Sequence, residues 1–488
     1  MPLHILSPFV FLLLLYGCAA QPSLSFPPIE PEPASLTPAQ CRQYLQAIDE
    51  TVRRHHNQDA QDYAIPGLPF LRTNRILSTY ASAGLTPEQS RYWLNRLQQR
   101  DLEARALELR NLDAVRWEPV FAHYERCSRQ VLQAEPPRLP TRIEVPDDYQ
   151  DSKRVLGLYP LTSLFVKQRI RRLQADTRST FARPLDELEL KGTLVHYAPA
   201  AAFLSQAEFN TLLARSRDNP LRIPIPPPED LNRLFDHYAP VWAVDTLDDN
   251  DHIGKVVLDA TGRAHVDPKI PVVYRHYDLT QFHGKTLLQL NYTLWFPSRP
   301  SAGAFDIYSG KLDGITFRLT LNEDGEPLLA DSMHNCGCYH QFYPTGALAP
   351  NQAAIEREPE PPLIVQTLPA WTHGARYMLR IASGNHYIQR ILSIDAPTLA
   401  GTVYTPLDYN ELRSLPLPSG GYGSMFDETG LVPGTERAER WLLWPLGVPS
   451  PGAMRQKGRH AIAFVGKRHF DDPDLIARFF TIKHVPLK

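Results

Sequence analysis

The hydrophobic pattern of this chain changes its period near Pro240, and this change constrains the fold more than any other feature. Before Pro240, apolar residues recur at helical spacing, as in Cys41, Tyr44, Leu45, Ile48 and Val52. Beyond it they alternate with polar residues, and in residues 287–296, LLQLNYTLWF, leucine and aromatic side chains share one face. The sequence therefore predicts an α+β fold, in which an N-terminal helical bundle is followed by a mostly antiparallel β-rich domain.

Two capping boxes mark the starts of helices in the first part. Thr37-Pro38-Ala39-Gln40 and Thr86-Pro87-Glu88-Gln89 each combine an N-cap threonine, a proline at the first helical position and a glutamine three residues after the cap. We expect further helices at 75–83 and 119–132. Residues 35–135 are thus predicted to form a helical domain. Residues 136–240 are predicted to be a linker with a mixed helical segment, and residues 241–488 the β-rich domain.

The chain begins with an apolar segment that is too short for a permanent membrane span. Residues 5–16 are almost continuously apolar and are followed by Gly17-Cys18. Because a spanning helix needs about 20 apolar residues, residues 1–17 are predicted to be a secretory signal peptide. The last four residues of the segment, Leu15-Tyr16-Gly17-Cys18, resemble the lipobox of bacterial lipoproteins.

The lipobox resemblance implies cleavage before Cys18 and acylation of Cys18 with palmitate-like chains, which would hold the protein firmly on a membrane. Ala19 replaces the Asp that retains such lipoproteins at the inner membrane, which implies an outer-membrane anchor facing the periplasm. Residues 18–34 are rich in proline and are predicted to be an extended tether. The alternative is an ordinary exported protein in which Cys18 is unmodified.

Cys41 and Cys127 both lie on apolar helical stripes. In an oxidising compartment such a pair is predicted to form a disulfide, which on the chain-entropy model stabilises the fold by about 4 to 5 kcal/mol. The alternative is two buried free thiols.

HNCGCYH, residues 334–340, places four potential metal ligands at alternate positions: His334, Cys336, Cys338 and His340. In a continuous strand alternate Cα atoms lie about 6.8 Å apart, so the first and last ligands would be separated by about 20 Å. One ion could not then bind all four, because zinc ligands lie within about 2.0 to 2.3 Å of the metal. Gly337 offers the bend that a compact site needs.

Three chemical hypotheses fit this segment. The leading one is a transition-metal site, because two thiolates and two imidazoles suit zinc and thiolates also suit copper as Cu(I). The second is a Cys336–Cys338 disulfide, which would be strained and easily reduced. The third is a cysteine nucleophile that His334 or His340 activates. A loop that packs against the sheet without any chemistry is the remaining alternative.

Composition and motifs argue against several other functions. The 51 basic and 53 acidic residues nearly cancel, so the sequence lacks the excess of positive charge that is typical of nucleic-acid-binding proteins. Residues 418–430, PSGGYGSMFDETG, have neither a GxSxG elbow nor the lysine of a phosphate-binding loop, and CGCYH is not the CxxCH of a c-type haem site. Ile253 stands where a calcium loop of EF-hand type would need Asp or Asn, so we expect a solvated acidic loop at Asp245, Asp248, Asp249 and Asp251.

A segment with the pattern DGxxxRxTL, here Asp313 to Leu321, precedes CGCYH at 336–340. In this respect the mature chain is similar to a group of proteobacterial lipoproteins for which no activity, fold or ligand is known. Together these features predict an outer-membrane-anchored periplasmic lipoprotein whose Cys/His cluster binds zinc or copper. One alternative is a non-catalytic structural or assembly lipoprotein of the cell envelope, stabilised by disulfides and with envelope partners still to be identified. The other is a Cys/His-dependent envelope enzyme.

Overall fold

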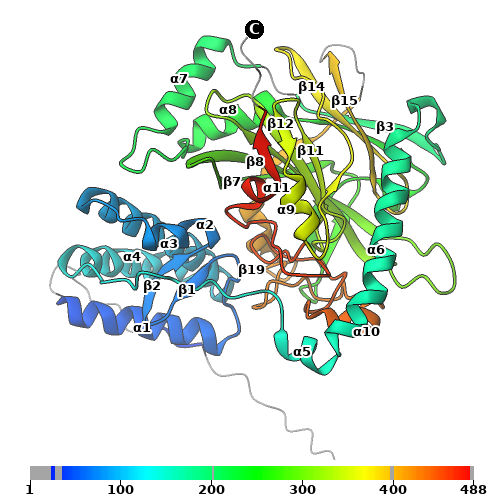
Figure 1. Ribbon diagram of the computed structural model, residues 1–488. Helices are drawn as coiled ribbons and strands as arrows, with labels where there is room; N and C mark the ends of the chain where they lie inside the picture. Colours follow the sequence, from blue (N-terminus) through cyan, green and yellow to red (C-terminus); the bar gives the residue numbers. More distant parts are fainter. Residues whose placement is uncertain (1–23, 28–35, 201–202, 396–400, 484–488) are drawn as a thin grey trace, which may run out of the picture.

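An α+β architecture follows the change in hydrophobic period, with helices first and a β-rich region after them (Figure 1). The computed structural model describes residues 24–27, 36–200, 203–395 and 401–483. The predicted signal peptide, Cys18 and most of the tether lie outside these residues. Within the described part of the chain, no helix has both the length and the hydrophobicity needed to cross a bilayer.

The N-terminal part is built around three long helices, α1 (Pro38–Arg54), α3 (Pro87–Leu112) and α4 (Trp117–Ala134). The predicted capping boxes begin α1 and α3, and both show the reciprocal hydrogen bonds of that motif. The sequence did not predict the hairpin of β1 (Tyr63–Ile65) and β2 (Leu68–Thr73), which lies between α1 and α3 and is followed by the short helix α2 (Arg75–Ser78).

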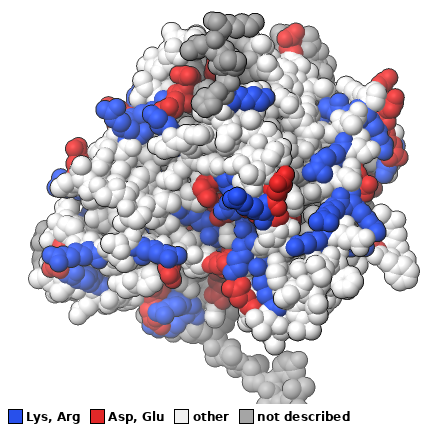
Figure 2. Space-filling view, in the orientation of Figure 1, with Lys and Arg blue, Asp and Glu red and all other residues white. Residues whose placement is uncertain are grey.

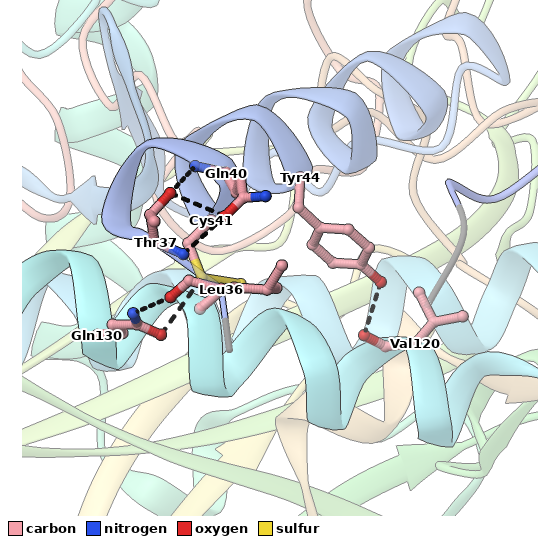
Figure 3. The surroundings of a disulfide bond; sticks show 8 residues. Leu36, Thr37, Gln40, Cys41, Tyr44, Val120 and Gln130 are labelled. Carbon is pink, nitrogen blue, oxygen red and sulfur yellow. Dashed lines mark hydrogen bonds between the residues drawn. A yellow bond between two sulfur atoms is a disulfide. The ribbon is translucent and has the colours of Figure 1, made fainter. Parts of the chain in front are cut away.

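A disulfide between Cys41 and Cys127 joins α1 to α4, which confirms the predicted pairing (Figure 3). Both cysteines are buried in the core of the helical domain. Nearby, Gln130 Nε2 donates to the Leu36 carbonyl at 2.5 Å, and the Tyr44 hydroxyl donates to the Val120 carbonyl at 3.4 Å. Covalent and polar contacts therefore fix the same pair of helices.

Two sheets share the main hydrophobic core of the β-rich region. The larger has the strand order β13-β11-β10-β9-β8-β7-β17 and the smaller β15-β14-β4-β3-β16. The larger sheet consists of β7 (Val272–Phe282), β8 (Lys285–Arg299), β9 (Gly310–Leu321), β10 (Pro327–His334), β11 (Gln341–Pro344), β13 (Leu363–Ile364) and β17 (Thr405–Asp408). The smaller consists of β3 (Thr193–Ala198), β4 (Val241–Thr246), β14 (Ala375–Ile381), β15 (Ile388–Asp395) and β16 (Thr402–Val403).

The core side of the larger sheet carries the predicted alternating residues. Phe317 on β9 meets Trp242 on β4 edge to face, with ring centroids 6.3 Å apart. The strand pairings β7–β8, β8–β9 and β9–β10 are antiparallel, and the β9–β10 register places His334 opposite Ile315 and Asp331 opposite Arg318. Since side chains alternate along a strand, Asp331 and His334 point to opposite faces of this sheet.

The region 136–240 contributes both helices and a strand. It supplies α5 (Asp151–Leu156), α6 (Tyr159–Ala182), β3, α7 (Gln206–Ser216) and α8 (Pro228–Tyr238). Leu234 on α8 and Tyr197 on β3 belong to the main core, so this segment is part of the β-rich body. In Figure 1, α6 runs along the side of this body that lies away from the helical domain.

Short elements complete the fold. They are α9 (Gln352–Arg357), α10 (Arg440–Leu443), α11 (Leu475–Phe479), and the strand pairs β5 (Lys255–Leu258) with β6 (Ala264–Asp267), β12 (Leu348–Pro350) with β20 (Phe480–Ile482), and β18 (Leu415–Pro416) with β19 (Tyr422–Gly423). The helix expected at 473–480 is α11, which is shorter because Phe480 begins β20.

Charged side chains join the helical domain to residues 455–472, which we call the C-terminal segment. Arg75 contacts Asp148 at 3.0 Å and Asp471 at 3.2 Å. His469 lies among Asp147, Asp148 and Asp472; burial lowers its pKa, but hydrogen bonds to Asp147 and Asp472 outweigh burial and raise the pKa to about 9. The cation so formed ties the linker to the C-terminal segment.

Removing the disulfide should destabilise the helical domain. The bond spans 86 positions of sequence, so replacing Cys41 and Cys127 by Ala should lower the free energy of unfolding by about 4 to 5 kcal/mol. Denaturant unfolding with and without reductant measures this change. Reductant should lower the stability of the wild type and leave that of the double variant unchanged. Equal stability of the wild type and the double variant without reductant would contradict the expectation.

Candidate dithiol site

The HNCGCYH segment forms a tight hairpin loop at the end of β10. The Gly337 N–H donates to the His334 carbonyl at 2.7 Å, and the His334 N–H donates to the Cys338 carbonyl at 3.0 Å. Gly337 has φ of +88°, in the left-handed region that favours glycine. These features are typical of a three-residue hairpin loop closed by a left-handed residue. Gly337 therefore supplies the bend that the sequence suggested.

Asn335 fastens this loop to the larger sheet. Its N–H donates to the Gly314 carbonyl at 2.9 Å and its Nδ2 donates to the Leu294 carbonyl at 3.0 Å. Its Oδ1 accepts a hydrogen bond from Thr316 at 2.9 Å. Arg455 adds a contact from the C-terminal segment, because its Nε donates to the Cys336 carbonyl at 3.1 Å. Polar groups of the buried loop thus find partners on β8, β9 and the C-terminal segment.

The loop brings Cys336 and Cys338 together as a pair of unbridged, buried cysteines. The Cys338 N–H donates to Cys336 Sγ at 3.4 Å. Hydrogen bonding to Cys336 and burial raise the pKa of the Cys338 thiol well above its ordinary value. Because the thiolate is the nucleophilic form, Cys338 is poorly suited to attack a substrate at neutral pH.

His334 belongs to a chain of buried ionisable side chains on the core side of the sheet, and burial lowers its pKa although Asp313 raises it. Its Nδ1 lies 3.5 Å from Asp313 Oδ1, and Asp313 Oδ2 contacts His386 Nδ1 at 2.9 Å. Burial raises the pKa of Asp313, but His334 and His386 outweigh it and hold the pKa well below its usual range. His386 Nε2 lies 3.3 Å from Asp251, and although burial lowers the pKa of His386, Asp251 and Asp313 leave it raised.

His340 faces a different carboxylate, on the opposite side of the sheet. Its Nε2 lies 2.9 Å from Asp331, which also accepts hydrogen bonds from Arg318 at 2.9 and 2.5 Å. Burial lowers the pKa of His340 to about 4 despite Asp331, so the ring is neutral at pH 7. With the Nε2 proton directed at Asp331, the buried Nδ1 carries a lone pair and has no partner among the described residues.

The four predicted ligands therefore divide into a sulfur pair and two separate histidines. Across the described residues, no group of three or more His, Cys, Asp or Glu side chains has the geometry to hold a metal ion. The structure brings Cys336 and Cys338 together but does not assemble the four-ligand site, because Asp313 and Asp331 hold the two histidines on opposite faces.

A cavity of about 440 Å³ opens beside the sulfur pair. One wall is the face of α6 that carries Val166, Ile170 and Leu173, and the opposite wall includes Cys336, Cys338 and His340. Glu439 also lines the cavity, and burial raises its pKa to about 7 even though Arg437, Arg299 and Arg455 lower it. The thiols thus border a space large enough for a small ligand, next to a carboxyl group that titrates near neutrality.

The acidic loop was predicted to be solvated, but two of its four aspartates are buried. Asp245 is buried and accepts hydrogen bonds from the N–H groups of Lys191 and Gly192, both at 2.8 Å. Asp251 is also buried and accepts from the Leu247 N–H at 2.9 Å. Only part of the cluster is solvated, since Asp248 and Asp249 remain nearer the surface.

Sequence reasoning missed the residues that position the histidines. Asp313, Arg318 and Asp331 each follow a buried apolar residue in a strand, and all three are themselves buried. A charged residue within an apolar strand needs a buried partner, and this signal could have drawn attention to them. Their partners could not be identified, because the pairing depends on strand register.

Comparisons with protein-family models, with curated proteins and with solved structures find no match to this chain. The site is therefore interpreted from its own geometry.

Substituting Gly337 should destabilise the loop. A Cβ at Gly337 would lie 2.5 Å from the Ala461 carbonyl oxygen, in addition to the cost of about 1 to 2 kcal/mol for a left-handed non-glycine residue. Gly262→Ala is the matched control, because Gly262 has φ of +76° and nothing lies within 4 Å of its Cβ position. Thermal unfolding should show a larger loss for Gly337→Ala, and equal losses would contradict the close contact with Ala461.

Proposed function

We propose that this chain is an outer-membrane-anchored periplasmic lipoprotein that binds a thiophilic transition metal ion, copper as Cu(I) or zinc, at Cys336 and Cys338. The observation that carries the proposal is the pair of unbridged cysteines that one tight loop holds together beside a cavity. Thiolate ligands suit Cu(I) and zinc among the biological metals.

His340 is the best candidate for a third donor. Its free Nδ1 lies on a ring that lines the same cavity, while its Nε2 faces a carboxylate. Histidines that bind metals commonly direct the second ring nitrogen to a carboxylate, which fixes the tautomer. Because three donors are not assembled in the described structure, binding requires the side chains to adjust around the ion.

The export signal and the disulfide support the proposed compartment. Disulfides persist in the periplasm and outside cells and are rare in reducing compartments, and Cys41–Cys127 is such a bond. The lipobox-like residues before Cys18 support an anchor at the start of the mature chain. Ala19, at the position where retained lipoproteins carry Asp, supports the outer membrane.

Metal binding can be measured on the mature chain with Cys18→Ser, purified without oxygen. We expect about one Cu(I) or zinc ion per chain, two thiols that react after chelation, and an affinity that rises with pH because metal binding releases thiol protons. Cys336→Ser and Cys338→Ser should each abolish binding, and His340→Gln should weaken it by about tenfold or more. His334→Gln is the control that leaves the stoichiometry unchanged, because its ring faces Asp313.

Two outcomes would overturn metal binding. If the protein contains no metal and both thiols are free, Cys336 and Cys338 do not bind a metal ion. Absence of both metal and free thiols would favour a second candidate, a reversible Cys336–Cys338 disulfide. The direct contact of the Cys338 N–H with Cys336 Sγ favours this candidate, because it places the two residues in the same tight turn.

The anchor has its own test. The wild-type chain should fractionate with outer membranes and incorporate radiolabelled palmitate, whereas Cys18→Ser should be recovered in the soluble periplasmic fraction. Recovery of wild type as a soluble, unlabelled protein would contradict the lipid anchor and would leave the metal site unaffected.

A further inference from the structure

Large apolar side chains gather on the surface where α5, the start of α6 and α10 meet. We call this surface the apolar patch and define it by six residues that are 59 to 76% exposed: Leu156, Leu161, Leu164, Phe165, Trp441 and Leu442. In α6 these residues follow the i, i+3, i+4 spacing of one helix face. Monomeric proteins rarely expose contiguous apolar surface of this kind, so the patch indicates an interaction site.

The patch is built on a firmly packed base. The turn at Trp444–Leu446 contacts α5, α6 and α10. Gly157, between α5 and α6, packs so closely on Pro445 that a Cβ would lie 2.3 Å from it. Arg154 Nε donates to the Leu446 carbonyl at 2.8 Å. The apolar side chains are thus presented by a fixed surface.

Positive charge borders the apolar patch. Residues 151–183 contain eight Lys or Arg and only two Asp. Lys153, Lys167, Arg169, Arg171 and Arg172 form no ion pair with another described residue. Figure 2 shows Lys and Arg side chains gathered over α6, on the right of the view, with mostly uncharged surface below them where Figure 1 places α5 and α10.

We infer that the apolar patch and its basic border dock on an anionic phospholipid surface. Interfacial membrane-binding helices combine Trp, Phe and Leu on one side with Lys and Arg nearby, and this is the combination found here. Basic residues bind anionic headgroups, whereas a purely apolar protein partner would leave these cations without counter-charges. The inference deepens the proposed function, because a lipid anchor at Cys18 would hold the patch within reach of such a surface.

Vesicle binding tests the inference independently of the anchor. The mature chain with Cys18→Ser is mixed with vesicles of phosphatidylethanolamine and phosphatidylglycerol, or of phosphatidylcholine alone, and recovered by flotation. We expect binding to the anionic vesicles that decreases with added salt, together with a blue shift of tryptophan emission. The double variant Leu164→Asp, Phe165→Asp should reduce vesicle binding by roughly tenfold or more.

Val115→Asp is the matched control, because Val115 is 88% exposed and lies in the helical domain, outside the patch. It should bind vesicles like the parent chain, and all variants should unfold at the same temperature. Binding that the double variant retains, or its absence in the parent chain, would overturn the inference. A dimer that forms without lipid and that the double variant abolishes would also overturn it and would assign the patch to a second copy. In each case palmitate labelling and metal binding still test the proposed function separately.

Discussion

Two buried aspartates, Asp313 and Asp331, determine how the region around the dithiol is arranged. An ionised carboxylate in the interior is costly unless cations or hydrogen-bond donors surround it. Asp313 contacts His386 and His334. Asp331 forms an ion pair with Arg318 and contacts His340. Because the two carboxylates lie on opposite faces of one sheet, the histidines that satisfy them are separated as well.

This separation changes the chemistry that the Cys/His segment can support. A cysteine nucleophile needs an adjacent base or another source of a lowered pKa. Here the Cys338 thiol is instead hydrogen-bonded to Cys336 and buried, and both effects raise its pKa. A protonated Cys338 thiol is a poor nucleophile, whereas a metal ion that binds it displaces the proton. The raised pKa therefore argues against Cys338 as a nucleophile, and the metal site stays a proposal in which sulfur is the main donor.

Local patterns predicted much of the fold because they depend on neighbouring residues. The capping boxes located α1 and α3, and alternation located β8 and β9. Two apolar stripes, in a chain predicted to be exported, indicated the Cys41–Cys127 bond. The hairpin of β1 and β2 was missed because its short strands carry no clear alternation and lie between helices. The bend at Gly337 could be predicted, since glycine readily adopts a positive φ.

The partners of His334 and His340 could not be predicted, because they depend on the register between strands. A shift of one residue between β9 and β10 would move Asp331 to the other face and change its partners. His386 is 73 residues from Asp313, and no local pattern links them. The sequence thus singled out the segment 334–340, while its division into a thiol pair and two separate histidines required the tertiary structure.

Helix α6 connects the cavity to the apolar patch and gives both a common orientation. Val166, Ile170 and Leu173 line the cavity, whereas Leu161, Leu164 and Phe165 near the start of the same helix are exposed and belong to the apolar patch. A helix held against a bilayer by its first turns would fix the direction of the turns that follow. Docking at the apolar patch would therefore set the height of the dithiol above the lipid surface at a few helical turns, since each turn rises about 5.4 Å.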